Sequence, residues 1–166
     1  MEDAEVICCF SGHRPEKLPW RYNESDERCI FLKKRIREAC ESAVEAGKTH
    51  FVCGMAKGCD TYFAEEVFYL KARYPRITVE AAIPCREQAK SWSGEQRRRY
   101  DEIVSLCDVV TVLSENYTKD CMSRRNKYMV DKSSLLISVF DGGYGGTMQT
   151  VGFALKRGIK IIQIIP

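Results

Sequence analysis

The sequence predicts an α/β fold, namely a Rossmann-like three-layer α/β/α sandwich with a mainly parallel sheet. Short apolar segments alternate with amphipathic helical segments along the whole chain. Several of the short segments are apolar at every position, which is typical of parallel strands that are covered on both faces. Because strand–helix–strand connections are right-handed, such an alternation places helices on both faces of one sheet.

The strands are expected where short apolar runs meet turn residues. The first run ends at Ser11-Gly12, the second at Gly54 and the third at Pro84. The fifth run is nearly all apolar and leads into a cluster of glycines. In chain order, the expected strands are residues 6–10, 51–53, 77–83, 108–113, 135–140 and 159–165.

The helices are expected where apolar residues recur at the spacing of one helix face. Residues 100–107 show this spacing most completely. Gly47 and Gly158 are expected to end the first and last helices, and Pro75 lies just beyond the second. In chain order, the helices are expected around residues 32–43, 64–68, 100–107, 124–131 and 151–155.

Length and composition indicate one globular domain over residues 1–166. Hydrophobic residues make up 45% of the chain and charged residues 30%, so a disordered protein is excluded. The net charge is only +3, and the chain has no basic tail. We therefore do not expect nucleic acid as a partner.

The nine cysteines are expected to be mostly buried, reduced thiols in a cytoplasmic protein. The chain has no Cys-x-x-Cys pair, and its two histidines are His13 and His50, so no metal site is expected. A disulfide framework and a structural zinc are the alternatives. The first residues lack the pattern of a signal peptide, and no apolar stretch approaches the roughly 20 residues of a membrane helix, so we expect no membrane association.

The loops that follow the strands carry most of the glycines, which is the main sign of a binding site. In a doubly wound sheet, ligands bind beyond the carboxyl ends of the strands. The glycines outside these loops include the two expected helix ends, Gly47 and Gly158. Seven of the eleven glycines fall in the post-strand loops: Gly12, Gly54, Gly58, Gly142, Gly143, Gly145 and Gly146.

The segment from Gly142 to Thr147 is the sharpest feature, because it joins a buried strand to a helix. Glycines there bring backbone N–H groups close to a ligand at a helix N-terminus, which favours phosphate or carboxylate. Thr147 could cap that helix and also donate its hydroxyl to the anion. The alternative is a flexible tight turn. The segment is neither a Walker A loop nor the dinucleotide fingerprint, in which the third glycine would replace Met148.

A second loop of this kind runs from Gly54 to Asp60. Asp60 could cap the following helix or contact a ribose hydroxyl, and the two interpretations carry similar weight. Among the cations, Arg14 is expected to bind phosphate because it directly follows the first strand. Arg124 and Arg125 lie either near the pocket or on a solvated helix face.

The other candidate side chains have equally plain structural interpretations. The Arg97-Arg98-Arg99 run is expected to be a solvated helix face. His13 could act as a base or a hydrogen-bond donor, but positioning its neighbours is the preferred role, since the sequence identifies no partner for it. Trp92 could stack on a base or pack against the core. Cys85 and Cys121 are weak candidates for reactive thiols.

Five segments in order along the chain resemble one known family. They are Ser11-Gly12-His13-Arg14-Pro15 with Lys17-Leu18, Gly54-Met55-Ala56 with Gly58 and Asp60, Ile83-Pro84-Cys85 with Gln88 and Trp92, Arg125-Asn126 with Tyr128-Met129-Val130-Asp131, and Asp141-Gly142 with Gly145-Gly146-Thr147. Together they resemble the YpsA-type branch of the SLOG superfamily, which includes LOG-type phosphoribohydrolases and the DNA-processing protein DprA.

The resemblance implies a Rossmann-like fold and a pocket for a nucleotide-derived ligand. It is also compatible with a homodimer, although the sequence shows no interface stripe. The residues that we expect to bind the ligand are Ser11, Gly12, His13, Arg14, Gly54, Met55, Gly58, Asp60, Pro84, Gln88, Trp92, Arg125, Asn126, Asp141, Gly142, Gly145, Gly146 and Thr147.

The chain departs from the LOG-type enzymes at the glycine loop. Their loop reads Pro-Gly-Gly-x-Gly-Thr, followed by two residues and a Glu of the hydrolytic machinery. Here Asp141 replaces the Pro, an extra residue precedes Thr147, and Thr150 stands where the Glu belongs. The departure puts hydrolysis in doubt.

Three functions follow, in order of preference. The first is a sensor or regulatory module that binds a nucleoside phosphate or an ADP-ribose-like molecule, with no cofactor required. The second is a nucleotide N-glycosidase, for which Asp60, Asp131 and Asp141 are the candidate catalytic carboxylates. The third is DprA-like binding of single-stranded DNA.

Overall fold

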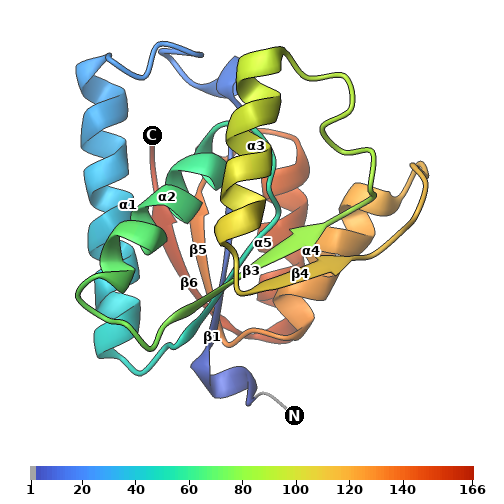
Figure 1. The fold of residues 1–166 in the computed structure, drawn as a ribbon. Helices are drawn as coiled ribbons and strands as arrows, with labels where there is room; N and C mark the ends of the chain where they lie inside the picture. The colour runs from blue at the N-terminus through green and yellow to red at the C-terminus, as the bar shows by residue number, and fades with distance from the viewer. Residues whose placement is uncertain (1–2) are drawn as a thin grey trace.

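A computed structural model describes residues 3–166, and it confirms the expected α/β fold (Figure 1). The sheet has six strands in the order β4-β3-β2-β1-β5-β6, and every neighbouring pair is parallel. The strands are β1 (Ile7–Gly12), β2 (His50–Cys53), β3 (Thr78–Ile83), β4 (Val109–Val112), β5 (Leu135–Val139) and β6 (Lys160–Ile164).

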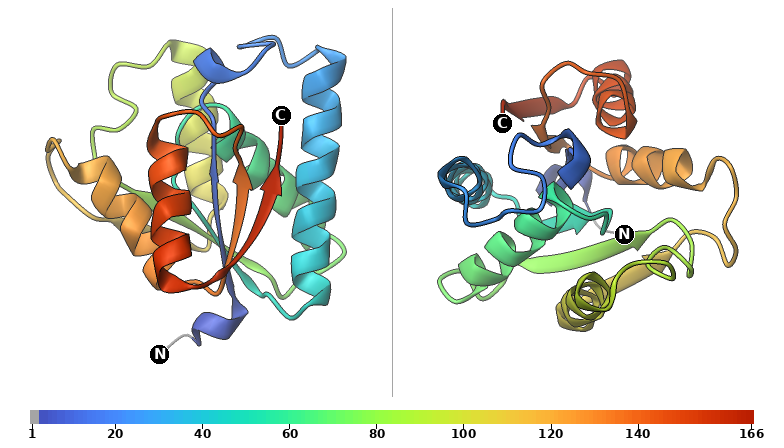
Figure 2. Two further views of the ribbon diagram at one scale, coloured as in Figure 1. Left: turned by 180° about the vertical axis from the view of Figure 1, so that it is seen from behind. Right: turned by 90° about the horizontal axis from the view of Figure 1, so that it is seen from above.

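Helices cover both faces of the sheet, as Figure 2 shows from above. The helices are α1 (Glu27–Glu45), α2 (Cys59–Lys71), α3 (Gly94–Leu106), α4 (Cys121–Asp131) and α5 (Gly146–Arg157), with short 3₁₀ turns at Ala4–Val6 and Pro15–Lys17. Helices α1, α2 and α3 lie on one face, and α4 and α5 lie on the other.

Alternate residues of β1 enter two separate cores, because successive side chains of a strand point to opposite faces. Cys8 and Phe10 pack in the core under α1 and α2, whereas Ile7 and Cys9 pack under α4 and α5. The strand is therefore buried on both faces, which explains its uninterrupted apolar run.

Helix boundaries follow capping groups that the apolar pattern does not reveal. Helix α1 begins at Glu27, before the expected start, because the Asp26 carboxylate accepts a hydrogen bond of 2.8 Å from the Arg28 N–H. Helix α3 likewise begins early, since Ser93 caps it. The expected helix end at Gly158 is confirmed, with a left-handed φ of 69°.

The cysteines are free thiols, so the disulfide alternative is wrong. All but Cys107 are buried, and burial raises the pKa of the Cys9 and Cys107 thiols to about 12. These thiols act as small apolar side chains. Within residues 3–166, no group of three His, Cys, Asp or Glu side chains could hold a metal ion.

The order of the strands places a topological switch between β1 and β5. The chain adds β2, β3 and β4 on one side of β1, then returns to add β5 and β6 on the other. The loops after β1 and β5 therefore diverge and leave a crevice at the carboxyl ends of these two strands. No helix in the described part of the chain is long and apolar enough to cross a membrane.

Candidate functional site

A pocket of about 180 Å³ lies at this switch point, and we call it the switch-point pocket. Loops after β1, β2 and β5 contribute to it, together with one face of α4. Its lining residues are Ser11, Gly12, His13, Arg14, Glu16, Lys17, Ala56, Asp60, Met122, Arg125, Asn126, Met129, Gly146 and Thr147.

The loop after β1 supplies two cations. The Arg14 side chain is exposed and makes no hydrogen bond or ion pair with any residue in 3–166. The Lys17 ammonium donates to the backbone carbonyl of Tyr144, in the glycine loop after β5. Gly145 has a φ of 145°, and a Cβ there would collide with the Lys17 ammonium. Lys17 thus closes the rim of the pocket, whereas Arg14 is available to a ligand.

His13 has a partner that the sequence did not identify. Its Nε2 lies 2.9 Å from Oδ1 of Asp141, and its side chain is only 3% exposed. The same carboxylate accepts a bond of 2.9 Å from the Gly143 N–H. The Gly143 bond, with a further contribution from His13, lowers the pKa of Asp141. The pair fastens the loop after β1 to the glycine loop after β5, and Asp141 itself does not line the pocket.

The N-terminus of α5 points donors at the pocket. Gly145 is its N-cap residue, and no side chain caps the helix. The expectation that Thr147 caps it is therefore wrong, because Thr147 is the second residue of the helix proper. The hydroxyls of Thr147 and Ser11 are on pocket-lining residues and bond to no other residue in the described chain. The first N–H groups of α5 likewise lack helical partners.

Asp60 does not cap α2 as one interpretation expected, because α2 has no side-chain cap. Its Oδ2 accepts a bond of 3.0 Å from the Ala56 N–H and fixes the loop after β2. The carboxyl is buried in the pocket wall. Burial raises the pKa of Asp60 to about 6, despite the opposing effect of the nearby Arg125 charge.

Arg125 is buried rather than solvated, with 4% of its surface exposed. It donates to the Gly54 carbonyl and, through Nε at 2.8 Å, to Oδ1 of Asn126. Nδ2 of the same Asn126 amide donates to no acceptor in the described chain, and it lies beside Gly146. Gly54 is required because a Cβ there would lie 2.6 Å from the Arg125 guanidinium.

We expect the raised pKa of Asp60 to appear in the pH dependence of stability. A carboxyl whose folded pKa exceeds its unfolded value of about 3.9 destabilises the fold progressively as pH rises through that interval. Replacing Asp60 with asparagine removes this penalty. The free energy of unfolding of Asp60→Asn, measured in urea, should therefore gain about 2 kcal/mol over the wild type between about pH 4.5 and pH 7. Other carboxyls titrate in both proteins and cancel in the difference. A difference that is the same at both pH values would contradict the burial of Asp60.

Half of the expected ligand-binding residues line the pocket, and their contact with a ligand stays a prediction. The others lie behind it or beside it. Gln88 donates to the Gly54 carbonyl at 3.0 Å, and Gly58 packs against Pro15. The expected residues that do not line the pocket are Gly54, Met55, Gly58, Pro84, Gln88, Trp92, Asp141, Gly142 and Gly145.

The structure places the side chains of Asp131 and Arg99 differently from what the sequence led us to expect. Asp131 is exposed at the end of α4 and pairs with Lys127 at 2.6 Å, so it is not a carboxylate of the pocket. Arg99 is not on a solvated face, because it is half-buried and paired with Glu24 and Glu65 at 2.6 Å each.

Five lining residues were not predicted from the sequence. Met122 and Met129 precede and follow Arg125 by three and four positions, which is the spacing of one helix face. That spacing would have identified both. Glu16 and Lys17 share the loop of Arg14, and Ala56 lies in the second glycine loop.

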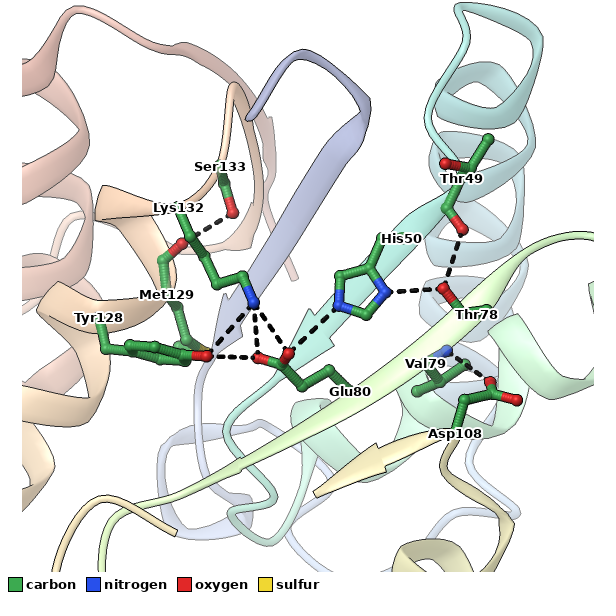
Figure 3. Close-up of polar contacts among 10 residues, drawn as sticks. All are labelled: Thr49, His50, Thr78, Val79, Glu80, Asp108, Tyr128, Met129, Lys132 and Ser133. Carbon is green, nitrogen blue, oxygen red and sulfur yellow. Dashed lines mark hydrogen bonds and ion pairs between the residues drawn. The ribbon is translucent and has the colours of Figure 1, made fainter. Parts of the chain in front are cut away.

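Figure 3 shows a second polar cluster, at the opposite end of the strands. The Glu80 carboxylate accepts bonds from Lys132 at 2.8 Å, Tyr128 at 3.0 Å and His50 at 3.3 Å. Burial raises the pKa of Glu80, but these bonds outweigh it and the net shift is downward. Because His50 also bonds to Thr78 at 2.7 Å, this cluster is satisfied internally and joins β2, β3 and α4.

Comparisons with known proteins agree with the expected resemblance. A family model named YpsA, described as the YspA SLOG family, matches residues 8–157. The uncharacterised SPbeta prophage-derived protein YoqJ of Bacillus subtilis is 28% identical over 140 residues, covering 76% of this chain and 82% of its own.

Two solved structures show the same fold. DNA processing protein A (DprA) of Streptococcus pneumoniae matches with a TM-score of 0.65 and 19% identity, over 96% of this chain and 50% of its own. DprA of Helicobacter pylori matches with a TM-score of 0.67 and 15% identity, over 96% of this chain and 65% of its own. The chain thus spans about half to two thirds of these DprA structures.

Proposed function

The chain belongs to the YpsA SLOG family, and from that premise we propose that its switch-point pocket binds the phosphate of a nucleotide-derived ligand, as a sensor or regulatory module. The ligand's phosphate would accept hydrogen bonds from the N-terminus of α5, and its ribose would face the loop after β2. No cofactor is part of the proposal.

The observation that carries the proposal is the set of donors that meet in the pocket without partners. Three come from buried side chains: the hydroxyls of Ser11 and Thr147, and Nδ2 of Asn126. A fourth is the uncapped N-terminus of α5. These donor atoms are open to the pocket, since within residues 3–166 the side-chain polar atom that is both buried and unbonded is the Ser138 hydroxyl. Several unpartnered donors that face one pocket favour an acceptor-rich ligand, and a phosphate offers several acceptor oxygens.

The charges in the pocket favour an anion with hydroxyl groups nearby. Three cations, Arg14, Lys17 and Arg125, line it together with the carboxylates of Glu16 and Asp60. The cations suit a phosphate, and a guanidinium can bind it bidentately. Carboxylates accept bonds from ribose hydroxyls and discriminate against a bare polyanion. The balance supports a nucleotide rather than inorganic polyphosphate.

The experiment compares two arginine variants. Arg14 lines the pocket and has no partner, whereas Arg124 is exposed on α4 and lies outside the pocket. In calorimetric titrations with 5′-AMP, Arg14→Ala should weaken binding by about tenfold to a hundredfold, the value of a charge-assisted hydrogen bond. Arg124→Ala should bind as the wild type does. Equal affinities in all three proteins would show that the ligand lies elsewhere.

A nucleotide N-glycosidase is the second candidate, and the buried Asp60 favours it. A carboxyl with a pKa near 6 can accept and return a proton at neutral pH. Against this, Thr150 is fully buried and its hydroxyl donates to the Gly146 carbonyl at 2.9 Å, so its position supplies no carboxylate. Steady release of free base from 5′-AMP, lost in Asp60→Asn, would establish catalysis.

Single-stranded DNA is a third candidate, which net charge alone led us not to expect. The DprA of Helicobacter pylori is described as having a unique single-stranded DNA binding mode. Since this chain shares its fold, a near-neutral charge is not sufficient ground to exclude such a ligand. Binding of an oligonucleotide that weakens steeply with salt would favour it over a free nucleotide.

A further inference from the structure

A second depression of about 450 Å³, which we call the tryptophan groove, lies beside the switch-point pocket. It is formed by the loop after the 3₁₀ turn Pro15–Lys17, the loop after β2 and the start of α3. Its lining residues are Tyr22, Glu24, Lys57, Ser91, Trp92, Ser93, Glu95, Gln96 and Arg99.

Lys57 is the distinctive side chain of the groove. Its ammonium lies 5.7 Å from the ring centre of Tyr22 and 5.5 Å from that of Trp92, and it donates to the Tyr22 hydroxyl at 3.2 Å. It forms no ion pair with any carboxylate in the described chain. Two aromatic rings therefore hold a half-buried cation that no carboxylate contacts directly. The nearest carboxylate to interact with its charge is that of Glu16, which the Tyr22 hydroxyl separates from Lys57.

The other cation of the groove is neutralised. Arg99 donates to both oxygens of Glu24, at 2.6 and 2.9 Å, and to Glu65 at 2.6 Å. Its charge and geometry are fixed by these bonds. An anion entering the groove would therefore meet Lys57 and not Arg99.

The groove and the pocket share a boundary. The Tyr22 hydroxyl donates at 2.7 Å to Glu16, which lines the pocket, and Ala56 of the pocket directly precedes Lys57 of the groove. The pocket is also smaller than the roughly 300–1,000 Å³ of typical ligand sites. A ligand held in the pocket must therefore extend outward, and the groove is immediately beside it.

We propose that the tryptophan groove is a second anion subsite, in which Lys57 contacts a second phosphate of the ligand and the rings of Tyr22 and Trp92 face its sugar or base. The ligand is then a nucleotide that carries a second phosphate one sugar away from the first. This inference rests on the proposed function, since the switch-point pocket holds the first phosphate. Either a nucleoside bisphosphate or a dinucleotide has this chemistry.

The test is a set of calorimetric titrations with three probes: 5′-AMP, adenosine 3′,5′-bisphosphate and the 5′-phosphorylated dinucleotide pApA. The wild type should bind adenosine 3′,5′-bisphosphate at least about tenfold more tightly than 5′-AMP, because of the added charge-assisted contact. Lys57→Gln should remove this gain and leave the affinity for 5′-AMP unchanged. The control is Lys90→Gln, which should keep the gain. Lys90 is exposed on the connection between β3 and α3 that also carries Trp92, but it lies outside the groove.

The probes also separate the two sources of the second phosphate. If pApA also binds more tightly than 5′-AMP, the subsite accepts a linking phosphodiester. If only the bisphosphate binds more tightly, the subsite requires a terminal phosphate. Either result supports the subsite. Equal affinities for 5′-AMP and the bisphosphate, or a gain that survives Lys57→Gln, would overturn it. These results differ from those expected if the proposed function itself is wrong. In that case 5′-AMP would not bind, or its affinity would not depend on Arg14.

Discussion

Replacing Arg125 with alanine is expected to abolish ligand binding and to lower the free energy of unfolding by about 3 kcal/mol. The side chain is buried and donates to the Gly54 carbonyl and to Asn126. Its removal leaves Oδ1 of Asn126 without that donor and leaves the buried Asp60 carboxyl without a compensating charge. Both affected groups, the Asn126 amide and the Asp60 carboxyl, line the pocket.

Urea unfolding and calorimetric titration with 5′-AMP measure the two effects. Arg124→Ala is the matched control on the same helix, and both quantities should stay near their wild-type values in it. Arg125→Lys should recover little of the lost stability or of the lost affinity for 5′-AMP, because an ammonium cannot reproduce the planar guanidinium that bridges two acceptors. Wild-type stability in Arg125→Ala would show that the pocket wall does not depend on these bonds.

Gly12→Ala is expected to have a similar effect on stability, for a steric reason. A Cβ at Gly12 would lie 2.5 Å from Cβ of Cys59, the first residue of α2, and 3.1 Å from the Phe10 ring. Neither neighbour can move freely, because both are fully buried. Overpacking of this kind costs about 1–3 kcal/mol or more. It would also displace the end of β1 that lines the pocket.

A compensating substitution tests that explanation. Cys59→Gly removes the opposing Cβ, so the double variant Gly12→Ala/Cys59→Gly should be more stable than the sum of the two single effects predicts. Gly152→Ala serves as the control, because its Cβ would meet nothing within 4 Å and alanine favours the helix. Additive single effects in the double-mutant cycle would locate the strain elsewhere.

The fold was predictable because its signals are local. Apolar runs that are buried on both faces, and glycines such as Gly158 with left-handed φ, leave a direct trace in the sequence. The ends of helices were less predictable, since Asp26 and Ser93 act through single hydrogen bonds that an apolar pattern does not include.

The candidate site was predictable only in part, because its contacts join distant segments. His13 and Asp141 are 128 positions apart, and nothing in either segment identifies the other as its partner. The same holds for Gly54 and Arg125, which are 71 positions apart. Post-strand position indicated the loops after β1, β2 and β5, which line the pocket, but also the loop after β3, which does not. It could not separate residues that line the pocket from residues, such as Gln88, that support its wall.

The central claim is that the phosphate of a nucleotide occupies the switch-point pocket. A crystal structure of the protein with 5′-AMP tests it most directly. We predict that the phosphate lies at the first N–H groups of α5, within hydrogen-bond reach of Thr147, Asn126 and Arg14. A nucleotide bound with its phosphate outside this pocket, or a pocket that stays empty at saturating 5′-AMP, would contradict the claim.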